Sequence, residues 1–249
     1  MFIRKGWLLN RSLSIIVPAY NEEARLPETL RRIAEYVSSR EFAFHEVLVV
    51  DDGSKDGTAE AARRFALGNP HFRLLQNPGN RGKGYSVRHG MLEAKGDWCL
   101  FTDADLSAPI EELERLWPAV GDGTEIAIGS RALDRSLIGT HQPGLRESAG
   151  RVFNLVMQLA TGLPFADTQC GFKLFRRDVA KEVFSRQLLE RFGFDVEILF
   201  IARKRGFRIA EVPVRWNHAE GSKVSMFTGL HAFGELAQVR WNDLTGRYR

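Results

Sequence analysis

The chain has 249 residues, of which 44% are hydrophobic and 27% are charged, enough for one folded domain with a sizeable core. This composition excludes a chain that is disordered throughout. The formal net charge is only +4, and no nucleic-acid recognition motif is present, so we expect no nucleic-acid partner.

The first half of the sequence alternates between short apolar runs and segments with helical spacing. Apolar runs predict five strands, at 13–17, 47–50, 72–75, 98–101 and 125–128. Helical spacing predicts helices between them, at 26–37, 58–67, 84–94 and 109–120. Strands that alternate with helices need crossover connections, so we predict an α/β fold with a mostly parallel central sheet and flanking helices. Polar residues directly follow several of these strands, and the carboxyl ends of parallel strands are where such sheets bind ligands.

The second half is less regular. Residues 133–145 have few apolar anchors, which predicts a mobile loop, and an apolar stripe at 152–159 predicts a helix. A further helix is predicted at 194–204, an extended segment at 208–216, and a last helical stripe from 226 to 241. No repeat or linker interrupts the sequence, so we expect a single domain over residues 1–249.

Two interpretations remain open for the apolar helical stripes. Most amphipathic helices pack against their own core, but such a helix can also lie among lipid headgroups at a membrane surface. Phe227, Phe233, Arg240 and Trp241 make the interfacial interpretation plausible for the C-terminal stripe.

The two cysteines, Cys99 and Cys170, are too few for a disulfide framework and lack the spacing of a zinc site. A reducing, cytoplasmic location is therefore expected. The first ten residues lack the long apolar segment of a signal peptide, and no run of about 18 apolar residues predicts a membrane span. Any membrane association is expected to be peripheral, at the cytoplasmic face.

Three motifs of the first half follow predicted strands. Asp103 and Asp105 flank Ala104 after the fourth strand, and two carboxylates in this spacing suit a divalent cation that bridges a diphosphate. Asp52 lies in a glycine-containing turn after the second strand, where its carboxylate suits a base N–H or a ribose hydroxyl. Tyr20 and Glu22 follow the first strand. The Tyr20 ring could stack on a base, and the Glu22 carboxylate could accept a hydrogen bond from a sugar or base donor. Each motif alone is also compatible with ordinary turn chemistry.

Together, in this order and spacing, the three motifs resemble the nucleotide-sugar-binding half of the family-2 glycosyltransferases. The resemblance covers residues 12–131 and implies a GT-A fold, a divalent metal (Mg²⁺ or Mn²⁺) and inversion at the anomeric carbon. Residues 132–223 would then form the acceptor half, and residues 224–249 a C-terminal amphipathic helix.

Motifs of the second half narrow the resemblance. The stretches that carry it are 80–84, 129–131, 167–175, 194–197 and 221–223. They resemble the dolichyl-phosphate β-glucosyltransferases and bacterial polyprenyl-phosphate sugar transferases, and 167–175 is closer to the glucosyl than to the mannosyl branch. This implies transfer of glucose from UDP-glucose to a polyprenyl phosphate, such as dolichyl or undecaprenyl phosphate, at a membrane surface.

The resemblance also implies roles for individual residues. The residues that would contact the nucleotide sugar are Pro18, Tyr20, Glu22, Asp52, Lys83, Asp103, Ala104 and Arg131. Asp103 and Asp105 would bind the metal. The mannosyl relatives have a glutamine as second metal ligand at the position where this chain has Ser107. Contacts to the acceptor phosphate fall to Arg146, Arg151, Lys173, Ser222 and Lys223.

The catalytic residues are predicted to be Asp105, Asp167 and Asp195. A phosphate monoester has a second pKa near ~6, so the acceptor is largely a dianion at neutral pH and needs positioning more than a strong base. Asp167 is therefore either a base, a group that orients Lys173 or a sugar hydroxyl, or a turn cap. Asp195 is the competing candidate and could instead be a helix-start residue.

Three rivals remain. The first is a mannosyltransferase that uses GDP-mannose with the same lipid, and the second is a family-2 transferase with a non-lipid acceptor. The third is a non-catalytic binding protein, against which the intact pair of Asp103 and Asp105 argues.

Overall fold

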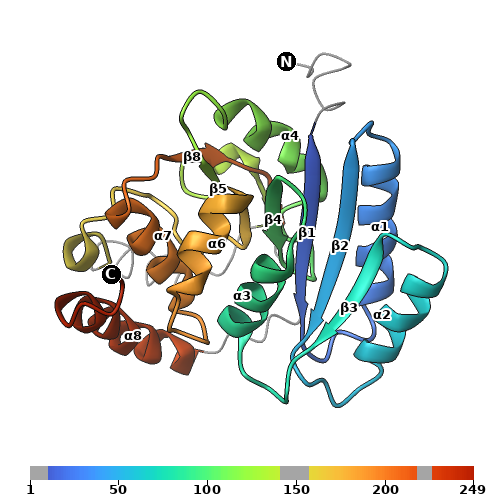
Figure 1. Cartoon of the computed structure of the whole chain (residues 1–249), viewed down its shortest axis with the longest axis horizontal. Helices are drawn as coiled ribbons and strands as arrows, with labels where there is room; N and C mark the ends of the chain where they lie inside the picture. Colours follow the sequence, from blue (N-terminus) through green and yellow to red (C-terminus); the bar gives the residue numbers. More distant parts are fainter. Residues whose placement is uncertain (1–10, 141–156, 218–225) are drawn as a thin grey trace.

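The computed structural model describes residues 11–140, 157–217 and 226–249. Its centre is a seven-stranded sheet with the order β3-β2-β1-β4-β7-β5-β8, and helices cover both faces (Figure 1). The strands are β1 (Ser12–Ala19), β2 (Phe44–Asp51), β3 (Phe72–Gln76), β4 (Trp98–Thr102), β5 (Ile126–Ser130), β7 (Phe172–Arg176) and β8 (Ile209–Pro213).

Most neighbours in this sheet run parallel. β1 pairs in parallel with β2 and β4, β2 with β3, and β5 with β8, whereas β7 lies antiparallel between β4 and β5. Parallel strands are buried on both faces and therefore have nearly continuous apolar sequences. The run Ile15–Val17 of β1 fits this rule, because all three side chains are fully buried. The predicted fold class, a single α/β domain with a mostly parallel sheet, is confirmed.

Two apolar clusters pack on the two faces of the sheet. The main helices are α1 (Leu26–Ser38), α2 (Thr58–Leu67), α3 (Lys83–Glu93), α6 (Arg177–Ser185), α7 (Phe194–Lys204) and α8 (Met226–Leu244). One cluster joins α3, α6, α7 and α8 through residues such as Met91, Phe184 and Val239. The other joins α1 and α2 through residues such as Ile33 and Ala62. Both faces of the sheet are thus packed against helices, and side chains at its strand ends are carried by well-packed elements.

Two predicted elements differ from the structure. The helix predicted over 109–120 is three short segments, η1 (Ile110–Glu112), α4 (Leu113–Leu116) and η2 (Trp117–Ala119). Proline 118 lies within η2 and has no N–H to continue a helical hydrogen-bond ladder.

The prediction of an irregular loop from residue 133 is wrong at residues 135–140, which have regular structure. Asp134 accepts a hydrogen bond from the Ser136 N–H and caps η3 (Arg135–Leu137). β6 (Ile138–Thr140) then pairs in parallel with β9 (Trp216–Asn217). The partner strand lies far along the chain, so the local sequence carried no sign of this order. Residues 141–145 lie outside the described part.

The predicted apolar stripes are less buried than core helices would be. Residues 157–161 are helical, with Met157 fully buried but Leu159 79% exposed; residues 152–156 lie outside the described part. Among the side chains of α8 that the structure describes, from residue 234 onward, Leu236, Val239 and Asn242 are buried, whereas Trp241 of the predicted stripe is 63% exposed. None of the helices within the described residues combines the length and hydropathy that a bilayer crossing requires.

Candidate active site

The three motifs of the first half meet at the carboxyl edge of the sheet. Each follows its own parallel strand, β1, β2 or β4, so the sheet brings them side by side as the ligand rule for open α/β sheets predicts. β7 runs the opposite way and therefore starts at this edge, which adds Gly171 and the loop before it to the same site.

The loops after β1 and β2 are tied together by hydrogen bonds. The Asn21 N–H donates to Ser54 Oγ at 2.9 Å, and the Lys55 N–H donates to Asn21 Oδ1 at 2.8 Å. The Glu22 N–H donates to Thr58 Oγ1 at 2.7 Å. Asn21 has a φ of 53°, in the left-handed region that asparagine tolerates better than most residues. Asn21 therefore holds the two motifs in register, a role that its sequence position did not reveal.

Asp52 holds the loop that leads into α3. Its buried carboxylate accepts hydrogen bonds from the N–H groups of Arg81 (3.0 Å) and Gly82 (2.7 Å) and from Asn77 Nδ2 (2.8 Å). Gly53 has a φ of 70°, and a Cβ there would lie 2.6 Å from the Gly79 carbonyl carbon, so the loops touch through backbone alone. Asn77 was missed, although it directly follows β3 at the same edge. The nucleotide contact of Asp52 stays a prediction.

Lys83 and Asp103 form an ion pair at the centre of the site. Lys83 is the first residue of α3, and its Nζ lies 2.6 Å from Asp103 Oδ1. Burial alone would lower the pKa of Lys83, but the carboxylates of Asp103 and Asp195 outweigh burial and raise it. A Cβ on Gly171 would lie 2.2 Å from Asp103 Oδ2, so only glycine fits beside this carboxylate. Lys83 is thus a fixed cation beside the Asp-x-Asp motif.

Asp105 lies in a tight turn after β4. Its Oδ1 accepts a hydrogen bond from the Ser107 N–H at 2.9 Å, and its Oδ2 lies 4.0 Å from Arg25 Nη1. Between them, Leu106 has a φ of 45°, an unfavourable conformation for a leucine, and such strain is often found at functional sites. Asp103 and Asp105 contact different partners, and within the described ranges no three Asp, Glu, His or Cys side chains gather as a metal-binding group.

Arg131 and Asp167 form a two-pronged ion pair. Arg131 Nε and Nη2 donate to the two oxygens of Asp167 at 2.7 and 2.8 Å, and the Arg131 N–H donates at 3.0 Å. Burial by itself raises the pKa of Asp167, but the charge and hydrogen bonds of Arg131 outweigh it and hold the pKa to about 2. Such a weak base is a poor proton acceptor at neutral pH. Asp167 also caps the turn before Gly171, because its Oδ1 accepts a hydrogen bond from the Gln169 N–H at 3.1 Å. Of the two functional roles, the geometry favours positioning, with Arg131 as the partner rather than Lys173.

Lys173 and Asp195 form a buried ion pair behind the site. Lys173 is 0% exposed, and its Nζ lies 2.5 Å from Asp195 Oδ1 and donates to the Cys170 carbonyl at 2.7 Å. The acceptor-phosphate contact predicted for Lys173 is therefore corrected, because a side chain sealed from solvent does not reach a ligand. Asp195 lies in the first turn of α7 and is 3% exposed. Its direct contacts make it a charge partner of Lys173.

The remaining predicted residues divide into two groups. Pro18 and Tyr20 are half-buried at the end of β1, and the Ala104 carbonyl accepts a hydrogen bond from Thr29 Oγ1 at 2.5 Å. The predicted acceptor residues Arg146, Arg151, Ser222 and Lys223 lie outside the described residues.

Cys170 is a buried packing residue. It is 1% exposed, and burial raises the pKa of its thiol to about 12. A thiol that stays protonated is not a nucleophile.

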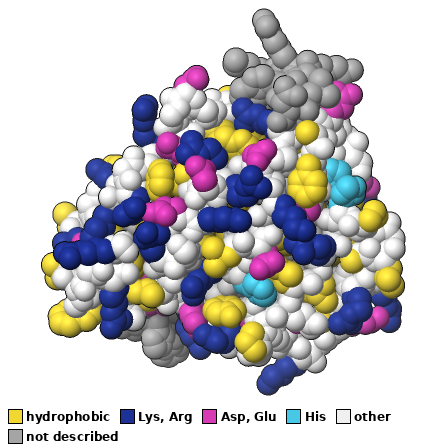
Figure 2. Space-filling view, in the orientation of Figure 1, with side chains coloured by type: hydrophobic (Ala, Val, Ile, Leu, Met, Phe, Trp, Pro, Cys, Tyr) yellow, Lys and Arg dark blue, Asp and Glu magenta, His cyan; other side chains and the backbone are white. Residues whose placement is uncertain are grey.

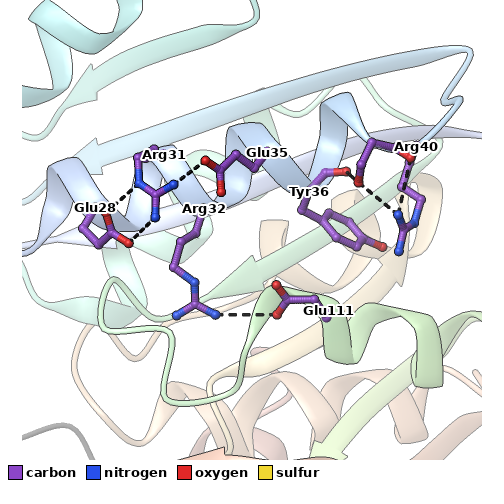
Figure 3. A pocket seen from close by; sticks show the side chains of 8 residues that line it. Glu28, Arg31, Arg32, Glu35, Tyr36, Arg40 and Glu111 are labelled. Carbon is purple, nitrogen blue, oxygen red and sulfur yellow. Dashed lines mark hydrogen bonds and ion pairs between the residues drawn. The ribbon is translucent and has the colours of Figure 1, made fainter.

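A groove of about 610 Å³ runs along α1 from Glu28 to Arg40 (Figure 3). Its three arginines form ion pairs. Arg31 pairs with Glu28 and Glu35, Arg32 with Glu111 at 3.6 Å, and Arg40 with Glu114 at 2.7 Å. The groove contains none of the motif residues that follow β1, β2 and β4, and its ion pairs lie at the surface, with side chains 26–63% exposed. The groove is therefore a poor candidate for the diphosphate, and the edge of the sheet remains the candidate site.

Comparison with known proteins agrees with this geometry. The family model described as "Glycosyl transferase family 2" matches residues 14–184, and the chain belongs to this family. The chain is 37% identical over 236 residues to the dolichyl-phosphate β-glucosyltransferase ALG5C of Trichomonas vaginalis, covering 91% of this chain and 70% of the relative. It is also 37% identical over 253 residues to the dolichyl-phosphate β-glucosyltransferase of Homo sapiens, covering 96% and 78%.

Solved structures share the fold at lower identity. Glucosyl-3-phosphoglycerate synthase from Mycobacterium tuberculosis, in complex with Mn²⁺, UDP and phosphoglyceric acid, matches with a TM-score of 0.66 and 18% identity, covering 96% of this chain and 84% of that one. Mannosyl-3-phosphoglycerate synthase from Rubrobacter xylanophilus matches with a TM-score of 0.68 and 18% identity, covering 95% and 75%. The predicted resemblance to family-2 glycosyltransferases is thus confirmed, and the protein is a glycosyltransferase.

Proposed function

We propose that the protein transfers glucose from UDP-glucose to a polyprenyl phosphate. The observation that carries the proposal is the set of charged residues at one sheet edge: Asp105, the Lys83–Asp103 pair and the Asp167–Arg131 pair. Relatives named dolichyl-phosphate β-glucosyltransferase that match 96% of this chain support the choice of sugar and acceptor.

The donor would lie across the ends of β1, β2 and β4. Tyr20 and Glu22 are proposed to contact the nucleoside, together with Pro18 and Asp52, at the tied loops after β1 and β2. The diphosphate would then lie over Asp103 and Ala104, within reach of the cations of Lys83 and Arg131. Both cations are held by carboxylates, so they need no reorganisation when the leaving group develops charge.

Asp105 is proposed as the principal ligand of a Mg²⁺ or Mn²⁺ ion, with Asp103 beside it. Magnesium in nucleotide sites is commonly held by one or two carboxylates together with substrate phosphates, and this pair supplies such a donor set. Structural neighbours crystallised with UDP and Mn²⁺ or Mg²⁺ support a divalent ion. When bound, the ion supplies positive charge that stabilises the departing diphosphate.

The reaction joins an oxygen of the lipid phosphate to the anomeric carbon and breaks that carbon's bond to the UDP oxygen, with inversion. The acceptor phosphate has a second pKa near ~6 and is already ionised, so no residue has to remove a proton. Asp167 holds Arg131 in place, and Asp195 with Lys173 supplies fixed charge behind Lys83. Arg146, Arg151, Ser222 and Lys223 remain the proposed acceptor contacts.

The proposed setting is the cytoplasmic face of a membrane, with α8 at the lipid surface. Trp241 and Leu244 are 63% and 75% exposed, and Arg240 on the same helix is 44% exposed. Figure 2 shows hydrophobic side chains at the lower left margin, over the region where Figure 1 places α8, with Lys and Arg side chains nearby. Exposed aromatic and basic side chains on one helix suit an interface between apolar tails and anionic headgroups.

A product assay tests the proposal. The protein is incubated with Mg²⁺, undecaprenyl or dolichyl phosphate, and UDP-glucose or GDP-mannose, and the lipid product is identified by mass. We expect a hexosyl-phosphate lipid from UDP-glucose only. Product from GDP-mannose alone would instead support the mannosyl rival, and turnover that does not depend on lipid phosphate would support a non-lipid acceptor.

A further inference from the structure

Glu211 supports the Arg131–Asp167 pair from the edge strand β8. Its Oε2 accepts a hydrogen bond from the Ala166 N–H at 2.9 Å, and its Oε1 accepts one from the Asp167 N–H at 2.8 Å. Glu211 is half-buried and lies opposite Ile128 in the register of β5 and β8. One carboxylate therefore pins two successive backbone groups of the loop that carries Asp167.

The pinned loop determines where Arg131 points. Asp167 is 8% exposed and uses both oxygens on Arg131, whose own side chain is 30% exposed. Arg131 also lies with its guanidinium carbon 5.6 Å from the centre of the Trp216 ring, so it is held on a second side. If the loop moves, the Asp167 carboxylate moves with it, and the guanidinium loses its geometry.

We infer that Glu211 is a positioning residue for the transfer reaction, acting on Arg131 through the backbone of residues 166 and 167. This inference rests on the proposed function, in which Arg131 faces the diphosphate of the donor. Misplacing a positioned group by about 1 Å can cost up to about 100-fold in rate, so a support of this kind has a kinetic effect without contacting substrate. A glutamine at position 211 has one oxygen that can accept a hydrogen bond from one of the two backbone N–H groups. Its NH₂ group faces the other N–H, and two donors cannot bond to each other.

A carboxylate near the other end of β8 offers a control. Glu125 Oε2 accepts a hydrogen bond from the Arg208 N–H at 2.9 Å, just before the amino end of β8. As with Glu211, a carboxylate accepts a hydrogen bond from a backbone N–H, but at the end of β8 that lies away from the site. Glu125 Oε1 also lies 3.8 Å from Arg176 Nη1, so Glu125→Gln measures what replacing a carboxylate that accepts a backbone hydrogen bond costs the fold at a place away from the site.

The test compares Glu211→Gln with Glu125→Gln in rate, thermal unfolding and amide hydrogen exchange. We expect Glu211→Gln to lower kcat about tenfold with a Tm close to that of Glu125→Gln, and to speed exchange at Ala166 and Asp167. In an Asp167→Asn background, Glu211→Gln should lower kcat by less than about twofold, because the effect passes through Asp167. Equal loss of rate in both glutamine variants, or full additivity with Asp167→Asn, would overturn the inference.

A readout without lipid separates this inference from the proposed function. Binding of UDP with Mg²⁺ is measured by calorimetry for the wild type, Glu211→Gln and Glu125→Gln. Weaker binding in Glu211→Gln alone, with faster exchange at residues 166 and 167, supports the positioning role even if no lipid phosphate is glycosylated. Unchanged exchange and binding in Glu211→Gln would refute it, even if the protein transfers glucose as proposed.

Discussion

The two halves of the molecule build the site in different ways. In residues 12–131, each motif follows its own parallel strand, so Asp52, Asp103 and Asp105 reach the sheet edge independently. The second half reaches the same edge through β7, the antiparallel strand inserted between β4 and β5, and through the loop before it. Its residues act largely as partners of the first half: Asp167 holds Arg131, and Gly171 makes room for Asp103.

The two halves therefore differ in role: the first-half motif residues are proposed to contact substrate or metal, whereas the described second-half residues hold them in place. Loss of a first-half group is expected to remove an interaction with the substrate or metal, whereas loss of Asp167, Gly171 or Lys173 in the described part of the second half is expected to disturb a neighbour. Four substitutions, taken from the largest expected effect to the smallest, test the distinction.

Asp105→Asn should abolish transfer, with a loss of about a thousandfold or more, because the amide lacks the charge that a divalent cation requires. Its side chain is only partly buried, so thermal unfolding should shift little. Initial rates of lipid glycosylation and a melting curve measure the two effects. Near-normal activity would remove the metal assignment.

Lys173→Met should chiefly destabilise the fold, by about 3–5 kcal/mol, because it leaves the buried Asp195 carboxylate without its partner. Chemical denaturation measures the loss. Replacing both residues, as Lys173→Met with Asp195→Leu, should recover much of the stability. A stable Lys173→Met protein that fails only in acceptor use would restore the phosphate role first predicted for Lys173.

Asp167→Asn should remove a pH-dependent part of the stability. The folded pKa of about 2 lies below the ordinary value of about 3.9, so the ionised carboxylate stabilises the fold above about pH 4 and loses that effect as the pH falls toward 2. By linkage, this is about 2–3 kcal/mol at neutral pH. Denaturation at pH 7 and pH 3 should show the gap between the variant and the wild type narrowing. A gap that is constant over this range would contradict the pairing.

Gly171→Ala should lower the rate about tenfold by pushing the Asp103 carboxylate out of place, since the new Cβ would lie 2.2 Å from it. Gly234→Ala in α8 is the control, because a Cβ there meets nothing within 4 Å. The control should leave the rate unchanged and stabilise the helix by about 0.5–1 kcal/mol. Equal rates for the two alanine variants would show that Gly171 does not support Asp103.

Much of the first half was predictable, because its signals are local. An apolar run followed by a turn with carboxylates identifies a strand end, and parallel strands bring such ends together. Asn21 and Asn77 follow the same rule, but their hydrogen-bond partners lie across other loops, so their roles needed the structure.

The second half was predicted less well, because its contacts join distant parts of the chain. Lys173 was assigned to a phosphate on the strength of its motif, yet its place in the central antiparallel strand seals it against Asp195. β6 forms a strand because it pairs with β9, and the backbone of Asp167 is held by the Glu211 carboxylate. Neither partner stands near in sequence.

By itself, the sequence determined the α/β class, the family and the motifs at the strand ends, because periodicity and turn chemistry are set by neighbouring residues. Only the tertiary structure decided which charges face each other: Lys83 with Asp103, Arg131 with Asp167, and Lys173 with Asp195. The physical reason is that the effect of a charge depends on burial and on distance to its partner, and both are fixed only when the sheet assembles.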